Sequence, residues 1–198
     1  MRTAAPLLLP LFRSDGQARL LARVYLSPDR PAPIAQLARE LDLDSGNLTR
    51  EADRLEDAGL VRSRRVGNQR LLEPEIDSAY YPDLLALLLK AFGPAAIVAP
   101  ALADIDGVEQ AYLFGSWAAR YLGEPGGDPN DIDLLIVGEP ARPAVVKATR
   151  ALTERLGREV NATIVTPQHW NERRSGFIRQ VRGAPLVALD LESSRNRG

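Results

Sequence analysis

A strand-like run that ends in Gly115-Ser116, followed by a second strand that begins Asp131-Ile132-Asp133, most constrains the fold of this 198-residue chain. Two carboxylates two residues apart on a strand point to the same side of the sheet. Together they offer oxygen ligands to Mg²⁺, a hard cation that binds carboxylates and substrate phosphates. A small Gly-Ser turn offers backbone N–H groups and a hydroxyl to the same phosphates. The pattern therefore predicts a metal–nucleotide site and indicates transfer of a nucleoside monophosphate.

Composition removes several other kinds of site. The chain has no cysteine and a single histidine, His169. Disulfides, zinc–thiolate centres and cysteine nucleophiles are thereby excluded, and a Ser-His-Asp triad is not expected. The formal net charge is −1, so any nucleic-acid binding must come from a local basic patch. No run of 18 apolar residues occurs, which predicts a cytoplasmic protein with no membrane partner.

The first half has the pattern of two short helices joined by a tight turn. Apolar residues at helical spacing predict helices over residues 15–26 and 34–41. A third helix is expected over 45–58, where Gly59 stands in the usual C′ position. Residues 60–65 and 70–72 then read as the two strands of a hairpin with four arginines. This order predicts a winged helix-turn-helix domain.

The stretch from Pro33 to Leu72 resembles the winged helix-turn-helix of ArsR- and MarR-type bacterial regulators. The resemblance is carried by Ile34-Ala35-Gln36-Leu37-Ala38, Leu48-Thr49-Arg50 and Leu55-Glu56-Asp57-Ala58-Gly59-Leu60-Val61. It implies that the helix over 45–58 enters the major groove of double-stranded DNA, while the hairpin holds the phosphate backbone. The residues implied on the helix are Ser45, Asn47, Thr49 and Arg50, and those on the hairpin are Arg62, Arg64, Arg65 and Arg70.

A second interpretation of these residues stays open. Four acidic side chains make the recognition helix itself acidic, namely Glu51, Asp53, Glu56 and Asp57. The polar residues would then only solvate a surface, or the winged helix would serve as a protein-binding module.

The middle of the chain contains a helix, over about 82–92, that is apolar nearly all round. Such a helix must be buried on several sides, which favours a homodimer because two-fold dimers suit paired DNA half-sites. The alternative is that it packs only between two domains of one chain. The expected organisation is a winged-helix domain at 1–77, a helical and dimerising linker at 78–105, and a further domain at 106–198.

The second half alternates strands and helices. Strands are expected at 108–114, 131–137, 159–165 and 185–189, and helices at about 116–122, 141–156 and 168–180. This alternation predicts an α/β domain with a small mixed sheet. Together with the winged helix, the fold class of the whole chain is α+β.

This half resembles the minimal nucleotidyltransferases of the DNA polymerase β superfamily, through Phe114-Gly115-Ser116 and the strand from Asp131 to Val137. The resemblance implies that Gly115 and Ser116 cradle the β- and γ-phosphates of a nucleoside triphosphate. It also implies that Asp131 and Asp133 hold two Mg²⁺ (or Mn²⁺) ions, which neutralise the phosphates and align the attacking hydroxyl.

The chain departs from that family at the third carboxylate. Strand alternation places Asn161 where the family has a metal-binding acid, and Glu159 is the nearby substitute. An amide brings no charge and cannot accept a proton. Three functions follow: a DNA-binding regulator that senses a nucleotide, an active transferase that modifies a protein, an RNA end or a small molecule, and a nucleotidyltransferase of the toxin–antitoxin kind. Arg120, Lys147 and Arg150 are either triphosphate contacts or ordinary surface charge.

Overall fold

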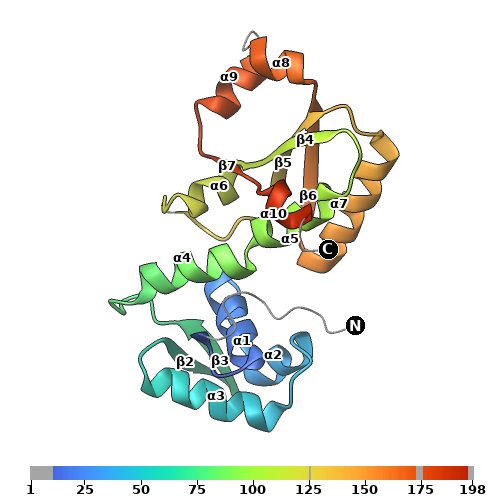
Figure 1. Ribbon diagram of the computed structural model, residues 1–198. Helices are drawn as coiled ribbons and strands as arrows, with labels where there is room; N and C mark the ends of the chain where they lie inside the picture. Colours follow the sequence, from blue (N-terminus) through green and yellow to red (C-terminus); the bar gives the residue numbers. More distant parts are fainter. Residues whose placement is uncertain (1–10, 125, 173–175, 196–198) are drawn as a thin grey trace. The chain divides into compact units, whose positions relative to one another are not determined.

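The computed structural model describes residues 11–124, 126–172 and 176–195. The chain forms two compact units, Met1–Gly93 and Pro94–Gly198, coloured blue to green and green to red in Figure 1. The division falls inside the segment 78–105 that the sequence suggests as a linker. Each unit has its own sheet.

The N-terminal unit consists of three helices, a three-stranded antiparallel sheet and a fourth helix. The sheet has the order β1-β3-β2, and β2 and β3 form the hairpin of the wing. The sequence missed the short strand β1, which pairs with Leu71 and Leu72. The elements are α1 (Asp15–Leu26), β1 (Ala32–Pro33), α2 (Ile34–Glu40), α3 (Ser45–Asp57), β2 (Val61–Val66), β3 (Gln69–Pro74) and α4 (Tyr81–Phe92).

Local chemistry sets the helix ends in this unit. The Ser14 hydroxyl caps α1 by accepting from Gln17 N at 3.1 Å, and the Asp44 carboxylate caps α3 by accepting from Asn47 N at 2.8 Å. Such caps satisfy donors that the first helical turn leaves free. Gly59 follows α3 at φ +66°, a conformation that glycine adopts without a steric penalty. The core then gathers apolar side chains from the helices and strands, among them Leu20, Tyr25, Leu37, Leu55 and Leu72.

Helix α4 and the following α5 (Pro94–Ala103) together make a stretch, Tyr81–Ala103, that is long and apolar enough to cross a membrane by length and composition. Gly93 between them is extended at φ −72°, ψ 173°. The stretch is therefore two short helices of 12 and 10 residues. At 1.5 Å per residue these measure about 18 and about 15 Å, and neither alone matches an apolar bilayer core of about 30 Å.

The C-terminal unit has a four-stranded sheet of order β6-β5-β4-β7. Strands β5 and β6 are parallel, and the other neighbours are antiparallel. The elements after α5 are β4 (Val108–Phe114), α6 (Gly115–Tyr121), β5 (Asp131–Gly138), α7 (Arg142–Leu156), β6 (Glu159–Val165), α8 (Pro167–Glu172), α9 (Gly176–Arg182), β7 (Leu186–Ala188) and α10 (Leu191–Arg195).

The sequence prediction differs from this unit in two places. The helix expected over 168–180 is described as α8 and α9, and its residues 173–175 lie outside the described part of the chain. Helix α10 was not expected at all. Strand β5 is central, and Ile132, Leu134, Leu135 and Ile136 have no exposed surface. Burial on both faces explains why this strand has a continuous apolar run after its two aspartates.

Candidate nucleic-acid interface and candidate nucleotide site

Helix α3 has one buried face and one face that is open to solvent. Leu48, Ala52 and Leu55 are at most 3% exposed, which fixes the rotation of the helix about its axis. Ser45, Asn47 and Arg50 consequently lie on the exposed side, and Thr49 is half-buried. The Thr49 hydroxyl donates to Ser45 O at 2.8 Å, and the Arg50 guanidinium donates to the Asn47 side chain. The four recognition residues expected from the sequence thus lie together at the start of the helix.

Three of the four wing arginines are held by carboxylates of the same unit. Arg62 lies 3.5 Å from Glu73 and 3.9 Å from Glu75. Arg64 forms an ion pair with Glu73. Among the residues that the structure describes, Arg65 forms no ion pair, and it is exposed. The wing therefore presents less uncompensated charge than its sequence suggests.

Arg70 connects the wing to helix α3. Its guanidinium lies 2.5 Å from both Asp53 and Glu56, and its side chain is 26% exposed. The Ser63 hydroxyl donates to the same Glu56 carboxylate at 2.7 Å. The hydrogen bond from Ser63 and the contact with Arg70 lower the pKa of Glu56 below its ordinary value. Arg70 is thereby engaged within the fold, where it stabilises the packing of the hairpin against α3.

In the C-terminal unit, the Gly-Ser turn and the Asp-x-Asp strand converge. Gly115 adopts φ +68°, and a Cβ atom at this position would lie 2.7 Å from Asp133 Oδ2. A side chain here would require the Asp133 carboxylate to move, and the left-handed backbone also favours glycine. Register supports the same geometry, since Phe114 on β4 pairs with Asp133 on β5.

Strand β6 completes the row of polar residues. Its parallel register sets Glu159 opposite Asp131 and Asn161 opposite Asp133. The Asn161 Nδ2 group donates to Asp131 Oδ2 at 3.2 Å. Burial, and then the charge of Asp131, raise the pKa of Asp133, while the amide of Asn161 lowers it. The amide is thus close to both carboxylates and offsets part of their repulsion.

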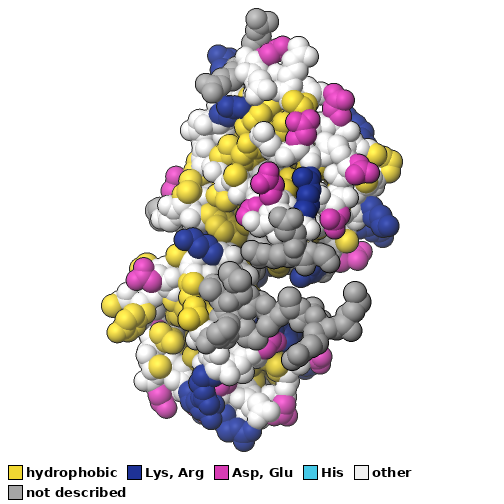
Figure 2. Space-filling view, viewed as in Figure 1, with side chains coloured by type: hydrophobic (Ala, Val, Ile, Leu, Met, Phe, Trp, Pro, Cys, Tyr) yellow, Lys and Arg dark blue, Asp and Glu magenta, His cyan; other side chains and the backbone are white. Residues whose placement is uncertain are grey.

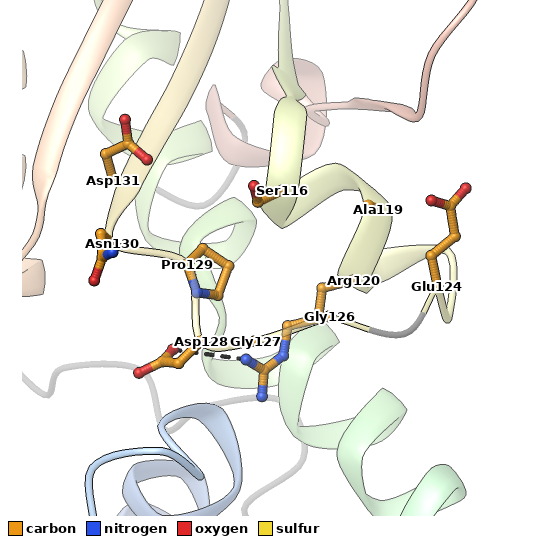
Figure 3. A pocket seen from close by; sticks show the side chains of 10 residues that line it. All are labelled: Ser116, Ala119, Arg120, Glu124, Gly126, Gly127, Asp128, Pro129, Asn130 and Asp131. Atoms are coloured by element: carbon orange, nitrogen blue, oxygen red, sulfur yellow. Dashed lines mark ion pairs between the residues drawn. The ribbon is translucent and has the colours of Figure 1, made fainter.

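A cavity of about 370 Å³ opens beside this row. Figure 3 shows Ser116 and Asp131 on its wall, together with Arg120. Glu124 and residues 126–130 supply much of the remaining wall. Of the three cations considered from the sequence, Arg120 lines the cavity, while Arg150 forms an exposed ion pair with Glu154 at 3.7 Å. Lys147 is exposed on α7.

A buried cluster that the sequence did not reveal holds the loop in place. Arg158 donates to both oxygens of Asp128 at 2.8 and 2.9 Å. Arg120 lies 3.6 Å from the same carboxylate, whose side chain is 3% exposed, and Figure 3 marks this ion pair. Both guanidinium groups lie over the Trp117 ring, at 5.6 Å for Arg120 and 5.5 Å for Arg158. The burial of Asp128 could not be predicted from the sequence, because an acidic residue in a loop rich in glycine and proline is ordinarily expected to be exposed.

The donors at this site are oxygens suited to a hard divalent cation. Two carboxylates and the Ser116 hydroxyl are oxygen donors of the kind that suits Mg²⁺ or Mn²⁺ bound together with a phosphate. Within residues 11–124, 126–172 and 176–195, no three acidic, His or Cys side chains converge as a metal centre. Beside Asp131 and Asp133 the described residues thus provide the Asn161 amide, which cannot accept a proton, in place of a third converging carboxylate.

The N-terminal architecture, with two helices, a tight turn, a recognition helix and an antiparallel hairpin, defines a winged-helix domain. Residues 13–70 match the model of the MarR family. The chain thus carries a MarR-type winged-helix domain in its N-terminal unit. No curated protein matches the chain.

Three solved structures are similar to parts of the chain. A mutant form of Lactococcus lactis ZitR is 16% identical, with 39% of this chain and 51% of ZitR covered, at a TM-score of 0.33. The transcriptional regulator BldR from Sulfolobus solfataricus is 20% identical, with 50% of this chain and 68% of BldR covered, at a TM-score of 0.37. RV1404 from Mycobacterium tuberculosis is 20% identical, with 73% of this chain and 74% of RV1404 covered, at a TM-score of 0.38. The chain thus spans about half of ZitR, and these scores support no argument about the whole fold.

Proposed function

We propose that the protein is a cytoplasmic DNA-binding transcriptional regulator whose C-terminal unit binds a nucleoside triphosphate with Mg²⁺. The observation that carries the DNA-binding part is the fixed rotation of α3. Leu48, Ala52 and Leu55 are buried, so the polar residues at the start of the helix point away from the core. A recognition helix reads base edges in the major groove with its N-terminal residues.

The nucleotide-binding part rests on the contact between Gly115 and Asp133. This contact brings the turn that suits phosphates next to the carboxylates that suit the cation. When bound, the cation would be held by Asp131 and Asp133 and would neutralise phosphate charge. Ser116 is positioned to donate its hydroxyl to a phosphate oxygen in the cavity.

Asn161 favours a sensing role over transfer. It stands in register with Asp133 and donates to Asp131. A carboxylate there would complete a metal site and accept the proton of an attacking hydroxyl, whereas an amide does neither. Glu159 lies opposite Asp131 on the same strand and is exposed. Active nucleotidyl transfer, to a protein or another acceptor, is therefore the second candidate.

DNA binding is tested by selecting duplexes from a random library and measuring their affinity by fluorescence anisotropy. We expect an enriched sequence whose affinity falls when Asn47→Ala removes a base-reading side chain. A direct base contact contributes about 1–3 kcal/mol of discrimination. If the protein enriched no DNA sequence from the library, the proposed role as a transcriptional regulator would be contradicted.

Nucleotide binding is tested by the thermal shift of the full chain with ATP, GTP, CTP or UTP and Mg²⁺. A ligand present at about 100 times its dissociation constant stabilises the folded state by about 2.7 kcal/mol. We expect one nucleotide to stabilise the wild type but not the Asp131→Ala, Asp133→Ala double variant. Incubation with α-labelled nucleotides and cell extract separates binding from transfer, because only a transferase attaches label to an acceptor.

We also propose that the regulator is a homodimer that uses α4. Only Leu88 and Leu89 of this apolar helix are fully buried, while Tyr80 and Ile76 just before it are 68% and 51% exposed. Light scattering after size exclusion tests this assembly. We expect the wild type to be a dimer and the Ile76→Asp, Tyr80→Asp double variant to be a monomer. A monomeric wild type would contradict the proposed assembly.

A further inference from the structure

A groove of about 510 Å³ lies between the N-terminal end of α1 and the exposed side of α3. Arg13, Ser14 and Gln17 form one wall, and Asn47, Arg50 and Arg54 belong to the other. Figure 2 shows Lys and Arg side chains gathered over the part of the N-terminal unit where Figure 1 places α3. The groove is therefore next to the helix proposed to read DNA.

A chain of hydrogen bonds joins the two walls. Gln17 Oε1 accepts from the backbone N of Arg13 at 2.9 Å, and Gln17 Nε2 donates to Glu51 Oε1 at 2.7 Å. Glu51 is itself largely buried, at 9% exposed. Gln17 thus ties the start of α1 to the middle of the recognition helix and fixes the backbone of Arg13 at the edge of the groove.

Charge compensation within the groove leaves two cations for a ligand. Glu51 Oε2 is taken by Arg54 at 3.1 Å, and the Asp44 carboxylate accepts from Asn47 N. Arg50 donates to the neutral side chain of Asn47. Within residues 11–124, 126–172 and 176–195, no carboxylate lies within ion-pair distance of Arg13. Because three wing arginines already have carboxylate partners, Arg13 and Arg50 carry much of the uncompensated charge near α3.

We propose that this groove seats a phosphate group of the DNA backbone, held by Arg13 from the start of α1 together with Arg50 from α3. The inference rests on the proposed DNA-binding function and adds a contact outside the recognition helix and the wing. Arginine suits a phosphate because its planar guanidinium can donate two parallel hydrogen bonds. A contact of this kind positions the protein on DNA and contributes equally to all sequences.

The test is the salt dependence of binding to a random-sequence duplex, measured by anisotropy with the full chain. Each phosphate contact contributes about −0.9 to the slope of log K against log salt. Arg13→Gln should therefore reduce the magnitude of the slope by about 0.9. Arg13→Lys, which keeps the charge, should retain most of it.

Lys90→Gln is the matched control, since it removes one positive charge from an exposed residue of α4. Within the N-terminal unit α4 packs on α1 and lies apart from α3 (Figure 1). A slope that is unchanged in Arg13→Gln, or reduced equally in Lys90→Gln, would overturn the proposed contact while leaving DNA binding intact. If the wild type fails to bind any duplex, the proposed function and this contact fall together.

Discussion

A Cβ atom added to Gly115 would lie 2.7 Å from Oδ2 of Asp133, and the glycine itself adopts φ +68°. These two residues come from different elements, the turn that begins α6 and the strand β5. Their contact is what makes the turn and the two carboxylates a single site. Glycine suits this position through its left-handed backbone conformation, and an added Cβ would require the Asp133 carboxylate to move.

Gly115→Ala should abolish nucleotide-dependent stabilisation of the C-terminal unit. The left-handed conformation costs a residue with a Cβ about 1–2 kcal/mol, and the new methyl group also displaces the Asp133 carboxylate. Both tryptophans, Trp117 and Trp170, lie in the C-terminal unit, so tryptophan fluorescence during urea unfolding measures its stability with and without Mg²⁺–nucleotide.

Gly123→Ala is the control for backbone strain alone. Gly123 has φ +80° and no atom within 4 Å of an added Cβ. It should lose similar stability but keep the response to nucleotide. If the two variants responded to nucleotide alike, the Gly115–Asp133 contact would have no part in binding.

Asn161→Asp should strengthen metal binding. A third carboxylate beside Asp131 and Asp133 increases the ligand charge, and we expect Mn²⁺ affinity to rise on the order of tenfold. Without metal the same change should lower the melting temperature, because it replaces a hydrogen-bond donor by a like charge. Isothermal titration with Mn²⁺ and thermal melts in chelator measure the two effects.

Gln69→Glu adds the same charge at an exposed position of the wing. It should alter neither the affinity for Mn²⁺ nor the melt in chelator. An Asn161→Asp variant that bound Mn²⁺ no better than wild type would show that the two aspartates do not share a cation.

Asp128→Asn should strongly destabilise the C-terminal unit. Arg158 and Arg120 would remain 8% and 10% exposed without their carboxylate partner. Breaking a buried ion pair from one side costs about 3–5 kcal/mol. Urea unfolding followed by tryptophan fluorescence is well placed to detect this, since both guanidinium groups lie over Trp117.

Glu154→Gln serves as the comparison for that variant. Its partner Arg150 is 83% exposed, and exposed ion pairs contribute about 1 kcal/mol or less. Equal losses in the two variants would mean that the Asp128 cluster does not organise the loop beside the cavity.

Glu56 should titrate below its ordinary pKa of 4.5. Hydrogen bonds from Ser63, and then the contact with Arg70, favour the charged form. A lowered pKa in the folded state means that this stabilisation is present above pH 4.5 and is lost as the pH falls through the lower folded value. Carboxyl chemical shifts measured by NMR over an acid titration give the folded pKa directly.

Ser63→Ala and Arg70→Ala should each raise that pKa toward the ordinary value. Arg65→Ala, on the neighbouring strand position paired with Arg70, should leave it unchanged. A Glu56 pKa that stayed low in all three variants would contradict the assigned cause.

Much of the fold follows from local patterns in the sequence. The buried stripe of α3 and its end at Gly59 are matched by the structure, as are the strands β4, β5 and β6. These features depend on apolar periodicity and on turn residues, both of which are visible in a short window of sequence. Strand alternation also placed Asn161 where the resembled family has its third carboxylate, and the register sets Asn161 opposite Asp133.

The partners of charged residues could not be predicted in this way. Arg70 reaches Asp53 and Glu56 across 17 and 14 residues, and Arg158 reaches Asp128 across 30. An ion pair of this kind depends on how separate elements pack, which no local pattern specifies. The same holds for Gln17 on α1 and Glu51 on α3, whose side chains form a hydrogen bond although they are 34 residues apart.

The parallel register of β5 and β6 has a genetic consequence. The codons for asparagine and aspartate differ in a single base, so one nucleotide substitution at position 161 separates a pair of carboxylates from a trio. A protein that binds a nucleotide and an enzyme that consumes it would then differ by a single mutation, because the surrounding strands already hold residue 161 in place.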